Sequence, residues 1–89
     1  MSLLRKIETS SAFKRDFKKK DIFNSSFIEV LYKLMNDEPL PEKYRDHSLI
    51  GDWSGYRECH IQPDLLLIYK KLDKGLLKLA RLGSHSELF

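Results

Sequence analysis

The sequence predicts an α+β fold in which two N-terminal helices pack on a small, mainly antiparallel sheet. Apolar residues recur at helical spacing in the N-terminal part of the chain, and a proline-containing segment then interrupts that period. Short strand-like segments separated by turn residues follow, which is typical of a β-meander. One of them, "DLLLIYKK", is apolar on both faces and is therefore predicted to be a central strand covered by the helices.

The N-terminus is expected to contribute a strand and a helix. Residues 2–8, "SLLRKIE", are predicted to form the first strand. Phe13 and Phe17 then recur at helical spacing with basic residues between them, which predicts a helix over about 10–20.

A second helix is predicted over about 25–37. Asn24 and Ser26 are residues that favour helix N-termini, and Glu29 follows Ser26 at the spacing of a capping box. One apolar stripe runs along this helix and consists of Phe27, Leu31, Leu34 and Met35. The helix should end at "DEPLPEKYRDH", because prolines cannot continue it.

The remaining chain is predicted to form four short strands. The turn signals between them are "GDWSG", "QPD" and "LDKG". The expected strands are residues 47–50, 56–61, 64–71 and 76–82.

The bulk composition indicates one packed domain over residues 1–89. The chain is 42% hydrophobic and 33% charged, as ordinary globular proteins are. Its longest apolar run, residues 65–69, is too short to span a bilayer, and no signal peptide is evident, so we expect a cytoplasmic protein without membrane contact. The single cysteine, Cys59, fits a reducing compartment and alternates with His60, so it should face the core.

The distribution of charge is compatible with a nucleic-acid partner. The net charge is +3, and its densest basic segment is "FKRDFKKKDIF", which includes Lys14, Lys18 and Lys19. Such a segment either contacts phosphates or forms the solvated face of a helix.

Polar residues are predicted to converge at one edge of the meander. His60 ends one strand and Asp64 begins the next, so both lie at the same edge. The following strand returns there at Arg81, and "LGSH" adds His85. His47 joins this group if "GDWSG" closes a hairpin in the right register.

Two kinds of chemistry use such residues, metal binding and metal-free acid–base catalysis. A metal site is disfavoured, because the spacings match no local ligand motif and Arg81 would repel a cation, so no metal or cofactor is expected. RNA cleavage needs only a base that deprotonates the 2′-hydroxyl and an acid that protonates the leaving 5′-oxygen. Arg81 would neutralise charge on the phosphate in the transition state.

Aromatic residues near the same edge are candidates for base stacking. Trp53 and Tyr56 have core or turn packing as the simpler interpretation, whereas Phe89, just beyond the edge, is the better stacking candidate.

The segments "YRDHSLIGDWSGYRECHIQPDLLLIYK" and "RLGSHSELF" resemble the YafQ branch of the RelE-type bacterial toxins. The resemblance implies a RelE-like fold and a toxin that cuts mRNA in the ribosomal A site without a metal. It also implies a cognate antitoxin that holds the toxin inactive, so the chain is expected as a monomer alone or as a hetero-oligomer with that partner. The family's functional positions fall on the polar edge residues already named and on Phe89.

Several points stay open at this stage. Base and acid are not assigned among the histidines, and His85 as the general acid is a hypothesis. Toxins of the ParE type share the fold and act by binding DNA gyrase, without need of an acid–base cluster. A third interpretation is a partner-binding domain whose histidines only satisfy backbone groups.

Overall fold

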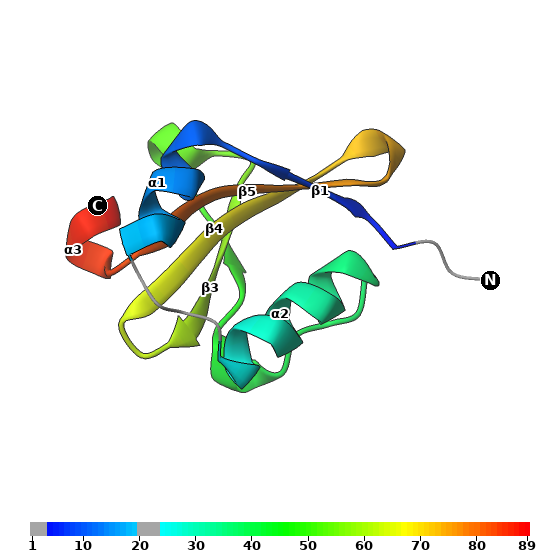
Figure 1. Ribbon diagram of the computed structural model, residues 1–89, viewed down its shortest axis with the longest axis horizontal. Helices are drawn as coiled ribbons and strands as arrows, with labels where there is room; N and C mark the ends of the chain where they lie inside the picture. The colour runs from blue at the N-terminus through cyan, green and yellow to red at the C-terminus, as the bar shows by residue number, and fades with distance from the viewer. Residues whose placement is uncertain (1–3, 20–23) are drawn as a thin grey trace.

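Strand β4 (Leu65–Leu72) is the central strand of a five-stranded sheet with the order β1-β5-β4-β3-β2 (Figure 1). This computed structural model describes residues 4–19 and 24–89. Residues 65–69 are buried in an unbroken run, so β4 contributes side chains to the core on both faces of the sheet. The prediction of a central strand covered by the two helices is confirmed, and the second face of the strand is covered as well.

The sheet is mainly antiparallel, as predicted. Strands β3 (Arg57–Gln62) and β5 (Leu76–Gly83) flank β4 antiparallel, and the short β2 (His47–Ser48) pairs antiparallel with β3. Strand β1 (Lys6–Thr9) pairs parallel with β5 at the other edge. The α+β class is therefore confirmed, with one parallel pair in a mixed sheet.

Two predicted strands differ in extent from those observed. Strand β2 ends at Ser48 rather than at Ile50, because Gly51–Trp53 forms a 3₁₀ helix that turns the chain back. The first strand was predicted over residues 2–8; the observed strand begins at Lys6 and ends at Thr9, and residues 1–3 lie outside the described part.

Helices α1 (Ser11–Lys19) and α2 (Ser25–Met35) pack on one face of the sheet. The predicted helices extended to residues 20 and 37; position 20 lies outside the described residues, and α2 ends two residues earlier. The predicted capping box of Ser26 and Glu29 is wrong. Asn24 caps α2 instead by accepting from the Phe27 N–H, and Glu29 accepts from the Tyr44 hydroxyl at 2.5 Å.

The opposite face is covered by a third helix and by the segment that follows β2. Helix α3 (His85–Leu88) was not predicted, although its capping box of Ser84 and Glu87 can be read in the sequence. Its Leu88 packs with Leu66, Ile68 and Ala80, and this cluster is completed by Leu49, Trp53 and Tyr56.

Gly83 allows α3 to lie this close to the sheet. A Cβ at this position would approach Glu87 Oε1 to 2.9 Å and Leu88 Cδ2 to 3.3 Å. A side chain at this position would therefore push the Glu87 carboxylate out of its capping hydrogen bond and press on Leu88.

Among the helices of the described residues, none has the length and apolar character needed to cross a membrane.

Replacing Asn24 by Ala should lower the free energy of unfolding by about 1 kcal/mol, because the α2 N-terminus loses its side-chain acceptor. Ser25→Ala, one residue later on the exposed first turn, is the control and should change it by less than about 0.5 kcal/mol. Urea unfolding of the three proteins measures both effects. Equal losses in the two variants would contradict the assignment of Asn24 as the cap.

Candidate active site

Two histidines share a buried carboxylate on the face of the sheet that carries α3. Side chains alternate along β3, so Glu58 and His60 project to the same face, and the pairing of β2 with β3 sets His47 opposite Glu58. Glu58 Oε1 lies 3.4 Å from His47 Nε2 and 3.5 Å from His60 Nε2. The Glu58 side chain is only 5% exposed, whereas that of His47 is 50% exposed.

The backbone fixes which nitrogen of His47 carries a proton. His47 Nδ1 lies 2.7 Å from the Arg45 carbonyl oxygen, which can only accept, so Nδ1 donates there. A neutral imidazole then presents the lone pair of Nε2 to Glu58. Contact with Glu58 is therefore favourable only when a proton lies between the two groups, on Nε2 or on the carboxyl group.

A half-buried hydrogen-bond network anchors the segment that precedes His47. Asp46 accepts hydrogen bonds from the Tyr69 hydroxyl and from Arg57 Nε and Nη2, and Arg57 Nη1 donates to Ser48. Burial and the bond to Asp46 raise the pKa of Tyr69, which therefore stays a donor. Arg45, whose φ of 49° lies in the left-handed region, is thereby held with its carbonyl toward His47.

Cys59 projects to the other face and is fully buried in the main core, as predicted. Burial raises the pKa of its thiol, so the reactive thiolate is disfavoured.

Arg81 is held by a carboxylate of α1. Arg81 Nε and Nη2 donate to the two oxygens of Asp16 at 2.7 and 3.2 Å, and the Leu82 N–H donates to Asp16 at 3.0 Å. Burial acts to raise the pKa of Asp16, but these hydrogen bonds outweigh it, so the pKa lies below its ordinary value of 3.8. The Arg81 side chain remains 29% exposed.

Asp64 and His85 form a second contact at the same end of the sheet. The His85 N–H points to Asp64 Oδ1 across 3.5 Å, a long hydrogen bond that connects the turn before β4 to the start of α3. The His85 ring lies 5.1 Å from the Phe89 ring between centroids, and both residues are exposed.

The direct contacts of the five predicted polar residues fall into three groups. His47 and His60 meet at Glu58, Asp64 meets His85, and Arg81 is turned to Asp16. The first group lies on β2 and β3, the second joins the turn before β4 to the start of α3, and Arg81 lies near the end of β5. The sequence analysis did not identify Glu58 and Asp16 as partners of these residues. Glu58 could have been found, because it stands two residues before His60 and therefore on the same face of the strand.

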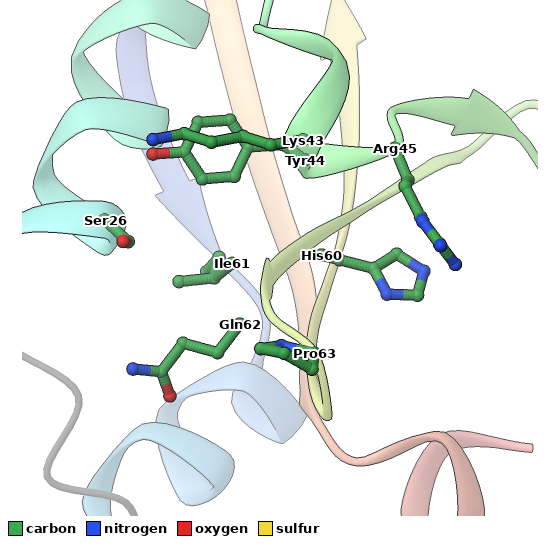
Figure 2. Close-up of a pocket in the computed structure, with 8 residues that line it drawn as sticks. All are labelled: Ser26, Lys43, Tyr44, Arg45, His60, Ile61, Gln62 and Pro63. Carbon is green, nitrogen blue, oxygen red and sulfur yellow. The ribbon is translucent and has the colours of Figure 1, made fainter.

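A pocket of about 410 Å³ opens beside His60. Figure 2 shows the His60 imidazole and the Arg45 side chain on one side of β3, with Ile61 projecting to the other. The remaining lining residues are Ser26, Lys43, Tyr44, Gln62 and Pro63. Lys43 and Arg45 give the rim a positive character that sequence reasoning did not identify.

The predicted substrate-binding lysines lie elsewhere. Lys14 and Lys18 border an apolar groove between α1 and α2 that is lined by Phe13 and Phe17 among others, and Lys19 is exposed at the end of α1. Within residues 4–19 and 24–89 no contact joins these lysines to the histidine cluster.

Residues 5–89 match the family described as "Bacterial toxin of type II toxin-antitoxin system, YafQ". The chain belongs to the YafQ family. It is 42% identical over 90 aligned residues, 96% of both chains, to the mRNA interferase toxin YafQ of Escherichia coli K12. The E. coli DinJ–YafQ complex matches with a TM-score of 0.80 at 41% identity, covering 96% of this chain and 98% of that one.

A YafQ-like toxin mutant from Helicobacter pylori, solved with copper bound, matches with a TM-score of 0.88 at 42% identity, covering 97% of this chain and all of that one. In the present chain, no group of three or more His, Cys, Asp or Glu side chains within the described residues is placed to hold a metal ion.

The lowered pKa of Asp16 gives a pH-dependent contribution to stability. Because the folded pKa is depressed, the contribution is fully present above about pH 4 and is lost as the pH falls through the folded value. The difference in melting temperature between the wild type and Asp16→Asn should therefore be largest near neutral pH and shrink below pH 4. A difference that stays constant from pH 7 to pH 2 would contradict the charged pair.

Proposed function

We propose that this chain is the toxin of a type II toxin–antitoxin system and acts as a metal-independent endoribonuclease that cleaves mRNA. The observation that carries the proposal is the histidine pair around buried Glu58, with His85 at the same end of the sheet. Membership in the YafQ family and the activity named for the E. coli relative support it.

The proposed reaction uses the nucleophile that RNA itself carries. The histidine pair with Glu58 takes the proton of the 2′-hydroxyl, and the freed O2′ attacks the adjacent phosphorus. The P–O5′ bond breaks, and His85 donates a proton to the leaving O5′. The products are a 2′,3′-cyclic phosphate and a 5′-hydroxyl end, and no bond requires a metal-bound water.

Arg81 is proposed to stabilise the phosphate, with Asp16 as the residue that positions it. A guanidinium has five N–H donors, and Asp16 accepts from only two of the Arg81 nitrogens. The remaining donors face the solvent-exposed side, where negative charge on the phosphate would grow in the transition state.

The other predicted residues receive supporting roles. Phe89 would stack on a base beside His85, and Asp64 would position the first residue of α3. Lys14, Lys18 and Lys19 would contact ribosomal RNA at a distance from the cut.

The proposed partners are a cognate antitoxin, as DinJ is for E. coli YafQ, and mRNA in the ribosomal A site. The proposed compartment is the cytoplasm, where mRNA is translated, and the proposed free toxin is a monomer.

Incubating the purified chain with translating ribosomes and a chelator, then mapping the mRNA ends, tests the activity. The wild type should cut and leave 2′,3′-cyclic phosphate ends, whereas His85→Ala should be slower by about 10²-fold or more because the acid is lost. Intact mRNA together with growth arrest in cells would contradict the proposal and favour a gyrase-binding toxin.

Replacing Glu58 by Gln should slow cleavage by at least about tenfold and change the shape of its pH–rate profile, since the two histidines lose their shared carboxylate. Asp52→Asn is the control, because Asp52 is an exposed carboxylate on the 3₁₀ segment Gly51–Trp53. This variant should leave the cleavage rate and the shape of the pH–rate profile unchanged. A profile identical in shape for wild type and Glu58→Gln would remove Glu58 from the proton-transfer group.

A further inference from the structure

Two lysines face each other on the sheet surface that carries the histidine cluster. Lys70 of β4 and Lys78 of β5 are direct cross-strand partners. Alternation along β4 places Lys70 on the same face as Leu66 and Ile68, which pair with His60 and Glu58. Like charges directly opposite one another disfavour strand pairing, so this arrangement carries a cost within the fold.

Both ammonium groups lie over one aromatic ring. Lys70 Nζ is 5.3 Å and Lys78 Nζ 5.9 Å from the centroid of the Tyr56 ring. Trp53 contacts that ring edge-on at 5.2 Å, with 82° between the ring planes. Cation–π attraction thus holds two positive charges side by side, and it does so without neutralising them.

Neither lysine forms an ion pair with a carboxylate in residues 4–19 and 24–89, although Glu8 of β1 is the register partner of Lys78. Two other lysines of the described residues do lie beside a carboxylate. Lys71, the next residue of β4 on the opposite face, lies 3.0 Å from Asp37, and Lys33 lies 3.4 Å from Glu38. What distinguishes Lys70 and Lys78 is that they place two unpaired positive charges side by side over one ring.

We propose that Lys70, Lys78 and Tyr56 form a phosphate-binding surface for the RNA strand that enters the active site, an inference that rests on the proposed function. Tyr56 stands two residues before Glu58, so the surface lies about 7 Å along the sheet from the histidine cluster. An RNA strand that follows this face from the cut would bring a neighbouring phosphate to the paired ammonium groups. This surface would increase the affinity for RNA and fix the position of the strand, and it would take no part in proton transfer.

The test measures binding of a 2′-O-methyl RNA oligonucleotide, which cannot be cleaved, at several salt concentrations. Lys70→Gln/Lys78→Gln should reduce the slope of log affinity against log salt by about 1.4, since each phosphate contact in a single strand contributes about 0.7. The matched control, Lys33→Gln/Lys71→Gln, removes the same two charges from compensated positions and should leave the slope unchanged.

Lys70→Arg/Lys78→Arg keeps both charges over Tyr56 and should retain wild-type binding. Lys78→Gln alone should lower the slope by about 0.7, which keeps the test decisive if the double glutamine variant fails to fold. Equal slopes for the two double glutamine variants would overturn the proposal. The proposal would also be overturned if Lys70→Gln/Lys78→Gln lost antitoxin binding while its RNA binding stayed unchanged. Failure of the wild type to cleave unmodified mRNA would instead count against the proposed function.

Discussion

The burial of strand β4 on both faces is the constraint on which the rest of this structure depends. Residues 65–69 separate one core under α1 and α2 from a second core under α3 and the segment after β2. With so few residues, the chain builds both cores on shared strands: β4 contributes to each, and β5 adds Leu77, Leu79 and Leu82 to one and Ala80 to the other. The polar residues are consequently left to the strand ends, and the candidate active site forms where β3, β4 and β5 meet at one end of the sheet.

Three of the candidate side chains, His47, His60 and Arg81, contact a carboxylate that is less exposed than themselves. Glu58 joins His47 to His60, and Asp16 fixes Arg81 from α1. The Asp46 network holds the backbone whose carbonyl sets the tautomer of His47. These carboxylates restrict side chains that would otherwise sample many rotamers, and such restriction is what acid–base catalysis requires of its groups. The helical layer therefore contributes to the site as well as to stability.

The sequence predicts those features of the fold that depend on local pattern. The helical period before the prolines and the doubly apolar strand correctly predicted the layers and the central strand. It did not predict α3, because four residues carry too little periodicity, nor the grouping of the polar residues. The meander predicts that the polar residues lie near one another at one edge of the sheet. Whether Arg81 turns to Asp16 or to the histidines depends on the packing of α1 on β5, for which the sequence contains no local signal.

The central claim is that side chains alone activate the RNA's own 2′-hydroxyl. A single 2′-deoxy substitution, introduced at the nucleotide 5′ of a mapped cut in an otherwise unmodified mRNA, tests this claim most directly. The account predicts that cleavage disappears at that position while cuts elsewhere in the same molecule persist, because only that nucleophile is removed. Cleavage at the deoxy position with an unchanged rate would mean that water or another group attacks the phosphorus, and the proposed roles of His47, His60 and His85 would be contradicted.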